Sequence, residues 1–336
     1  MNYYLKRFVR SGLTAYIVIT LTFVLTRLMP GGPADFVRAK VRRSNPAAGP
    51  EEINRMVEQY ISIRPDEPIW VQYIDYFISL LSFDLGTSFF YNRSVSAIYA
   101  EALPWTLFIM GVALIISLAI SIALGAFLAY HEGTKIDYFL STFSVTMNSI
   151  PYYIMGVFLL VIFAYTYGLF PSGNRTSMGI EAGFTLEYFI DVLWHAALPI
   201  LSVVLTAFGG RALRMRGNAI RVLGEDYLQV ARLRGLKSGR IRTQYVARNA
   251  VLPIYTSIMI QIGFMLGGSI ILEQIFRYPG VGYFFFRSIS SRDYPLMMGG
   301  FLIITFAVII AVTIADMTYG LIDPRASTGG DSHEAY

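Results

Sequence analysis

The sequence predicts an all-α, polytopic membrane protein with six transmembrane helices. The chain is 55% hydrophobic and only 15% charged, with a mean hydropathy of +0.53, so it is far more apolar than a typical soluble domain. Six stretches also lack any Asp, Glu, Lys or Arg, and a helix needs about 20 residues to cross a hydrocarbon core of about 30 Å. These stretches are 11–26, 102–130, 138–174, 192–210, 249–272 and 294–315.

The first stretch becomes long enough to span by continuing to Met29, with Arg27 close enough to the end for its side chain to reach the interface. No small-residue cleavage site follows it, and Pro30-Gly31-Gly32-Pro33 is typical of a turn. We therefore interpret residues 1–29 as the N-terminal segment and first span, not as a signal peptide.

The third stretch, 138–174, is too long for one straight span, and Pro151 interrupts it. Proline removes a helical hydrogen bond and bends a helix. We expect a span over about 140–168, kinked near Asn148–Pro151, with the remainder outside the membrane.

The charges of the connecting segments predict the orientation. The segments expected on one side hold 15 Lys and Arg residues, and the short loops on the other side hold four. Because cytoplasmic segments carry the basic excess, both termini are predicted to be cytoplasmic, in a cell membrane (plasma or inner). The basic side comprises the N-terminus, 131–137, 211–248 and the C-terminal tail; the other side comprises 175–191 and 273–293.

This orientation predicts three regions after the N-terminal segment and first span at 1–29. Residues 30–101 form an extracytoplasmic insertion between the first two helices, 102–320 a five-helix core, and 321–336 a cytoplasmic tail. Within the insertion, apolar residues at spacings of three and four predict an amphipathic helix whose apolar face packs. They are Trp70, Tyr73, Tyr76, Phe77 and Leu80.

Several kinds of chemistry lack their residues. The chain has no cysteine and three scattered histidines, and no Lys follows a Gly, so thiol, His-x-x-x-His metal and phosphate-loop sites are not expected. An ion-coupled carrier usually has carboxylates within the membrane, whereas the nearest here, Asp191, Glu273 and Asp316, lie at span edges. We predict no catalytic residue, no metal, no cofactor and no nucleic-acid partner; any energy must come from another subunit.

The segment 211–248 holds ten basic residues against Glu225 and Asp226, a formal charge of about +8 in a chain of +5. Helical spacing from 224 to 236, acids in the first turn and Gly235 at the end predict a short helix that closes in a left-handed conformation. A second basic helix over about 238–248 would follow. Charge alone would also fit a solvated loop that binds anionic lipid.

The order Ala231, Gly235, Leu252-Pro253 resembles the conserved cytoplasmic loop of importer permeases in the ATP-binding-cassette superfamily. Gln229 stands where that loop begins with Glu. The spacing from Gly235 to Leu252-Pro253 is also longer than in the sugar-permease version of the loop. Both departures fit the dipeptide/oligopeptide branch, which the runs Glu225–Leu236 and Arg248–Pro253 resemble.

Further short motifs in matching order extend this resemblance over residues 5–325. Asp84-Leu85-Gly86-Thr87-Ser88 is similar to an element of the B-type permease. In Pro30–Ala34, which is similar to the branch's Pro-Gly-Asp-Pro-Ala, Gly32 replaces the Asp. The other motifs are Pro68–Tyr73, His195 with Leu198-Pro199, Tyr278–Gly282, Arg292–Pro295 and Asp323–Arg325.

The resemblance implies a type I importer permease fold and a non-catalytic subunit that forms half of a pore. The partners it implies are a C-type permease, two ATPase subunits that bind ATP and Mg, and an extracytoplasmic solute-binding protein. The cargo would be peptides, or alternatively oligosaccharides, nickel chelates or glutathione. An ion-coupled carrier or channel is the alternative of another class, and a membrane enzyme is a third.

The resemblance also implies roles for residues. Coupling helices at 222–248 would dock on the ATPase, and a bulky side chain at Gly235 would destroy coupled transport. For the translocation path we predict Asn148, Gln261 and Glu273, although the first two could merely bond neighbouring helices. The ATPase-coupling residues are Glu225, Asp226, Tyr227, Ala231, Arg234, Gly235 and Leu236.

Overall fold

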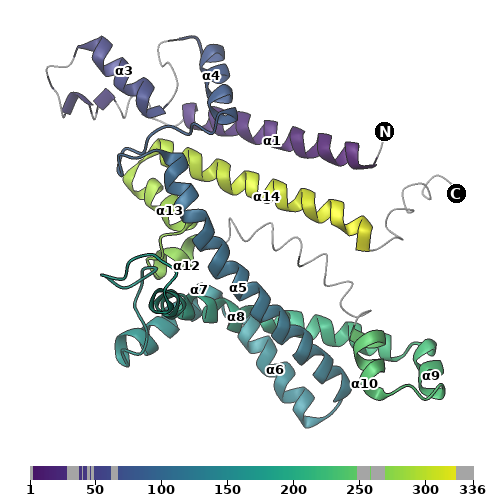
Figure 1. The fold of residues 1–336 in the computed structure, drawn as a ribbon. Coiled ribbons are helices and arrows are strands. Elements are labelled where there is room, and N and C mark those ends of the chain that lie inside the picture. Colours follow the sequence, from purple (N-terminus) through teal and green to yellow (C-terminus); the bar gives the residue numbers. More distant parts are fainter. Residues whose placement is uncertain are drawn as a thin grey trace. The chain divides into compact units, whose positions relative to one another are not determined.

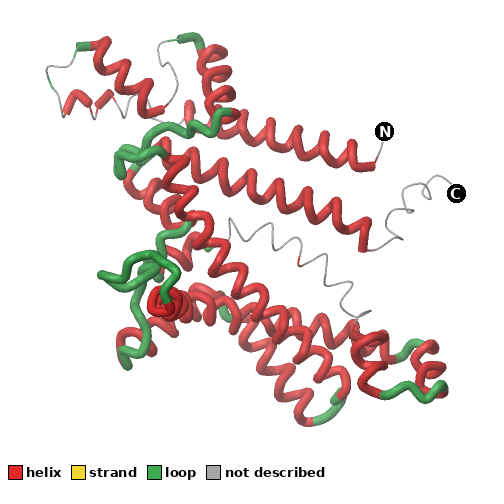
Figure 2. The backbone as a smooth tube through the Cα atoms, viewed as in Figure 1, coloured by secondary structure: helices red, strands yellow, loops and turns green. Residues whose placement is uncertain are grey.

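The computed structural model describes residues 3–28, 38–39, 41–43, 46, 49–61, 67–247, 258 and 269–322. The described residues are helical and loop, with no strand among them (Figure 2). Their only β pairing is an isolated bridge between Thr87 and Ser94. Two compact units are described separately below: Met1–Thr106 with Leu266–Ile270 and Pro279–Tyr336, and Leu107–Met265 with Ile271–Tyr278.

In the first unit, α1 (Tyr3–Leu28) and α14 (Tyr294–Ile322) lie side by side and antiparallel (Figure 1). Ser11 and Thr313 share a hydrogen bond of 2.7 Å between their hydroxyls. Only 17% of Phe8–Leu25, the apolar segment of α1, is buried, as expected for a helix that faces lipid. The unit also contains α3 (Pro50–Ile61) and α13 (Val281–Ser291).

The amphipathic helix predicted before the second span is confirmed as α4 (Ile69–Leu81). Tyr76 is buried against α1 and α14, and the Tyr73 hydroxyl lies 2.8 Å from that of Thr20. The predicted face is wrong at one position: Trp70 is 64% exposed. It lies in the first turn, before α4 meets its neighbours.

Asp293 joins two motifs that the sequence separates by about 200 residues. Its buried carboxylate accepts hydrogen bonds from Ser88 Oγ at 2.5 Å, the Phe90 N–H at 2.9 Å and the Leu296 N–H at 3.3 Å. The turn at 84–94 is therefore tied to the start of α14. The Asp-Leu-Gly-x-Ser and Arg-Asp-Tyr-Pro motifs therefore meet in one hydrogen-bonded site.

In the second unit, α6 (Lys135–Ser149) is followed by α7 (Tyr152–Leu159) and the π-helix η1 (Leu160–Thr166). The chain bends by 93° between α6 and α7, which confirms the predicted kink before Pro151. The helix α8 (Leu186–Leu223) packs against both α6 and α7, and 61% of its most apolar segment is buried. It is the central helix of this unit.

Among the residues that the structure describes, four helices are long and apolar enough to cross a membrane, or five if the bent pair counts as one span. They comprise Phe8–Leu25, α5 (Val95–Tyr130), α8 and Tyr294–Ile314. The other predicted span, 249–272, lies outside the described residues except for Ile258 and 269–272. Six therefore remains the predicted number of spans.

The predicted end of the fourth span at residue 210 is wrong as a helix end, because α8 continues to Leu223. Arg211, taken as the start of a loop, is buried, and its Nη1 donates to Ser117 Oγ at 2.7 Å. Ala212, Met215 and Ala219 are fully buried and continue the apolar face of the helix at spacings of three and four. The first charged residue marks where a helix leaves the lipid. Here the helix continues for about three more turns, because its apolar face packs against other parts of the protein.

Gly209 allows the close approach of α6 and α8. A Cβ there would overlap the Ser144 carbonyl, with its carbon only 2.8 Å away. Gly209→Ala is expected to destabilise the purified protein by about 1–3 kcal/mol through overpacking, measured as a lower thermal unfolding midpoint in detergent. The control is Gly217→Ala on the same helix, where a Cβ meets nothing within 4 Å. It should be neutral or stabilising, and equal losses in both variants would contradict this explanation.

Candidate functional site

The predicted pair of short helices is present. We call residues 224–247 the α9–η2 element; it contains α9 (Asp226–Leu233), α10 (Ser238–Arg240) and the π-helix η2 (Ile241–Ala247). It follows the C-cap of α8 at Gly224. The Glu225 carbonyl accepts the Leu228 N–H at 3.1 Å, and Asp226 lies in the first turn of α9, where a negative charge favours the helix.

The end of α9 is a Schellman motif, in which the chain reverses at a left-handed residue. Gly235 has φ +70, and the Leu236 N–H donates to the Ala231 carbonyl at 3.3 Å. Leu236 packs against the apolar cluster that contains Ala231. The predicted left-handed glycine is confirmed, and it turns the chain from α9 into α10.

The inner face of α9 is packed against the rest of its unit. Leu228 is 1% exposed and Ala231 is 4% exposed, so Ala231 does not lie on a surface that a partner could touch. Any contribution from Ala231 to coupling would come from fixing α9 in place. The cluster around these two residues contains Ala129, Met215, Ala219, Ile241, Val246 and Ile258.

The outer face of α9 exposes apolar residues at spacings of three. Tyr227 is 40% exposed, Val230 48% and Leu233 88%, with Arg234 beside them. We call Tyr227, Val230, Leu233 and Arg234 the outer face of α9. Val230 and Leu233 were missed by sequence reasoning, although apolar residues repeating opposite Leu228 and Ala231 are the signal that marks them.

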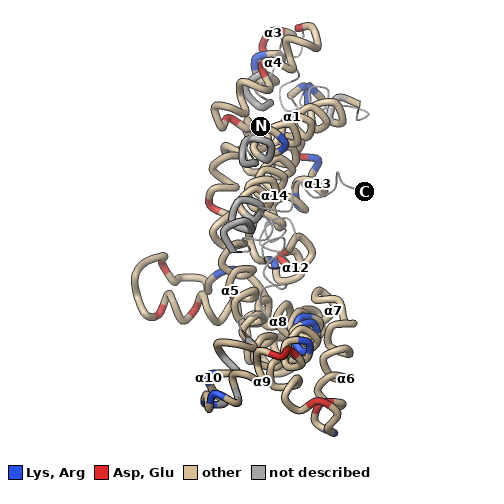
Figure 3. Tube along the Cα trace, turned by 90° about the vertical axis from the view of Figure 1, so that its right-hand side faces the viewer, with Lys and Arg blue, Asp and Glu red and all other residues tan. Residues whose placement is uncertain are grey.

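Basic residues continue beyond this face. Lys237 and Arg240 are exposed, and the Arg240 Nε donates to Gln244 Oε1 at 2.9 Å. Figure 3 shows the basic colour at α10. The element thus has a buried inner face, an exposed apolar outer face and basic residues beyond it. Aromatic residues and arginine, which here are Tyr227 and Arg234, are enriched in surfaces that bind another protein.

Gly235 supplies a test of the turn itself. A Cβ there would meet nothing within 4 Å, so the constraint is the backbone conformation and does not depend on bulk. Gly235→Ala is expected to cost the end of α9 about 1–2 kcal/mol, measured as faster amide exchange over 226–236. Gly235→Asn should be tolerated better, because asparagine adopts this conformation more readily. Gly239→Ala, also in open space, is the control; equal effects at 235 and 239 would contradict the assignment.

Two of the residues predicted for the translocation path are described, and they lie on different helices, Asn148 on α6 and Glu273 on α12 (Ile270–Ile275). Asn148 is exposed at the end of α6, where its side chain lies against Gly210 of α8. Gln261 lies outside the described residues. Glu273 is 1% exposed. Their role in a path stays a prediction.

Glu273 belongs to a buried group at the end of α12. The Tyr278 ring is fully buried and interacts electrostatically with both Glu273 and Arg175. The loop that carries Arg175 is held nearby, because the Asn174 N–H donates to the Phe276 carbonyl at 3.2 Å. Arg175 was missed because a lone arginine in a polar loop carries no sequence signal.

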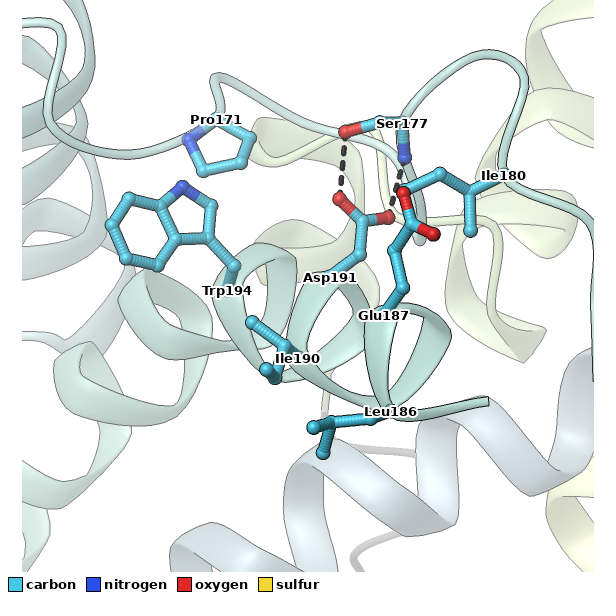
Figure 4. Close-up of a pocket in the computed structure, with 8 residues that line it drawn as sticks. All are labelled: Pro171, Ser177, Ile180, Leu186, Glu187, Ile190, Asp191 and Trp194. Carbon is cyan, nitrogen blue, oxygen red and sulfur yellow. Dashed lines mark hydrogen bonds between the residues drawn. The ribbon is translucent and has the colours of Figure 1, made fainter. Parts of the chain in front are cut away.

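A cavity of about 650 Å³ opens between the 171–180 loop and the start of α8 (Figure 4). The carboxylate of Asp191, which lines this cavity, already accepts hydrogen bonds from within the chain: one from the Ser177 N–H and one from the Ser177 Oγ, both at 2.7 Å. Asp191 also lies 3.5 Å from His195 Nδ1. These bonds hold the loop on α8, and we assign the cavity no ligand. It is lined by Pro171, Ser177, Ile180, Leu186, Glu187, Ile190, Asp191 and Trp194.

The fold and this element define a multi-pass helical membrane protein with a packed helical projection after its central helix. Residues 121–328 match the family described as binding-protein-dependent transport system inner membrane component. The chain belongs to this family and has its type I permease fold.

Similar proteins extend the match to almost the whole chain. The oligopeptide transport system permease protein AppB of Bacillus subtilis is 31% identical over 309 residues, which cover 92% of this chain and 93% of AppB. The dipeptide transport system permease protein DppB of the same organism is 30% identical over 325 residues, covering 96% and 97%. Escherichia coli K12 DppB is 30% identical over 338 residues, covering 94% and 96%.

Proposed function

We propose that this chain is the B-type permease subunit of an ATP-binding-cassette importer and that it forms half of a translocation pore for peptides. A C-type permease would supply the other half, and a solute-binding protein would deliver cargo from outside. Two ATPase subunits would bind ATP and Mg. The chain itself would catalyse nothing, and both termini would lie in the cytoplasm.

The observation that supports the coupling part of this proposal is that one face of α9 is buried and the opposite face exposes apolar residues. One side, Leu228 and Ala231, is buried in the same cluster as Met215 and Ala219 of α8. The other side exposes the apolar outer face. A helix that is packed against a spanning helix and exposes apolar residues can bind a partner and transmit that partner's conformational change to the spanning helix.

Peptides are proposed as cargo because the similar proteins are named for oligopeptide and dipeptide transport. Oligosaccharides, nickel chelates and glutathione remain the alternatives. A binding protein co-purified with its ligand would decide among them.

The proposal is tested by reconstituting the whole assembly in liposomes and measuring uptake of labelled di- and oligopeptides. We expect uptake that requires ATP inside, ATPase subunits and binding protein together. Uptake driven by an ion gradient without ATP would instead support a carrier. ATP-dependent uptake of another solute class, with peptides ignored, would retain the importer and reject the peptide assignment.

A further inference from the structure

A two-pronged ion pair joins α6 to the end of α8 that carries the α9–η2 element. Arg216 Nε donates to Asp137 Oδ1 at 2.9 Å, and its Nη2 donates to Asp137 Oδ2 at 2.7 Å. Glu132 lies 3.9 Å from the same Nη2. Planar, charge-assisted pairs of this kind fix both the distance and the orientation of their partners.

Asp137 is itself held by its own turn. Its Oδ2 accepts the Gly133 N–H at 3.0 Å and its Oδ1 accepts Ser141 Oγ at 3.1 Å, while its N–H donates to the N-cap Thr134 Oγ1 at 3.3 Å. The Asp137 side chain is only 5% exposed. The carboxylate therefore cannot change rotamer without breaking several bonds.

Arg216 lies about two helical turns before α8 ends at Leu223, where the α9–η2 element begins. Its neighbour in sequence, Met215, is fully buried in the cluster that holds Leu228 and Ala231 of α9. A displacement of α9 would be passed through that cluster to α8 at the turn that holds Arg216.

Farther from α9, α6 and α8 are in close apolar and backbone contact. The Ser144 backbone lies against Gly209, and the Asn148 side chain lies against Gly210. The rings of Phe143 and Phe208 are 6.3 Å apart. The ion pair between Asp137 and Arg216 joins the two helices at the end of this interface nearest to α9.

We infer that Asp137 and Arg216 are positioning residues for coupling: they make α6 move with α8 when the α9–η2 element is displaced. The mechanical role rests on the proposed function, but the positional role does not. A purely structural pair would affect the amount of folded protein, whereas a positioning pair sets where α9 lies relative to α6 in the folded protein.

The test uses the absence of native cysteines. Spin labels are placed at Lys135→Cys, the first residue of α6, and at Gln229→Cys on α9, both exposed positions. Their separation is measured by pulsed electron paramagnetic resonance in the complete assembly. Asp137→Asn and Arg216→Gln remove the charges. Arg216→Lys keeps the charge but not the fork, and Arg214→Gln removes an exposed arginine from the same turn as a matched control.

We expect one narrow distance in the parent chain and in Arg214→Gln, and loss of that narrow peak in Asp137→Asn and Arg216→Gln, with Arg216→Lys intermediate. In the same assemblies the ATP hydrolysed per solute imported should rise about tenfold. A narrow, unshifted peak in Asp137→Asn would overturn the inference, as would an unchanged ratio in assembled variants. If the parent assembly imported without ATP, the proposed function would fail, while the distances would still decide the positional role.

Discussion

Leu233→Asp is expected to reduce ATPase binding to the permease by about tenfold to thirtyfold, which corresponds to about 1.4–2 kcal/mol of binding free energy, because it replaces the most exposed apolar side chain of the proposed contact with a charged one. Leu233 is 88% exposed at the end of α9, and Val230 and Tyr227 continue its face. Placing a charge there removes an apolar contact and would bury an unpaired carboxylate in the complex. The measurement is the affinity of purified ATPase for the permease pair in nanodiscs.

Two controls accompany this prediction. Gln244→Asp adds the same charge to an exposed position of η2 that lies outside the outer face of α9, and it should change the affinity little. Thermal unfolding of the permease itself should be unchanged in both variants, because neither side chain is buried. Normal ATPase affinity in Leu233→Asp would mean that the outer face is not the contact surface and would weaken the coupling proposal.

Asp293→Ala is expected to lower the stability of the first unit by about 3–5 kcal/mol, since it leaves several buried donors without an acceptor and each costs about 1–3 kcal/mol. That is a large part of the 5–15 kcal/mol typical of a folded domain. The expected result is rapid proteolysis in the 84–94 turn and a lower unfolding midpoint. Ser88→Ala removes one donor and should cost less.

The design includes a cycle and a surface control. The double variant Ser88→Ala, Asp293→Ala should lose less than the sum of the two single variants, because both changes remove the same bond. Glu101→Gln breaks an ion pair with Arg93 whose side chains are 60% and 52% exposed, and it should cost under about 1 kcal/mol. Strict additivity of the Ser88 and Asp293 effects would contradict the direct bond.

Sequence reasoning was most successful where one local cause dominates. The kink before Pro151, the helix at 69–81 and the left-handed Gly235 each follow from a single residue type or spacing, and each is confirmed. It was weaker where partners lie far apart in the chain. Nothing local relates Asp293 to Ser88, or Arg216 to Asp137, because each pair meets only when distant helices pack.

The membrane class and the short helices after Gly224 were determined by the sequence alone, since lipid demands long apolar helices and a turn demands particular residues. Which side of each helix is used was decided only by the tertiary structure. Ala231 reads as a surface residue in its motif and Arg211 as the start of a loop, yet both are buried. The physical reason is that burial depends on the neighbours that packing supplies: Ala231 lies in one apolar cluster with Met215 and Ala219 of α8, and Ser117 of α5 accepts a hydrogen bond from Arg211.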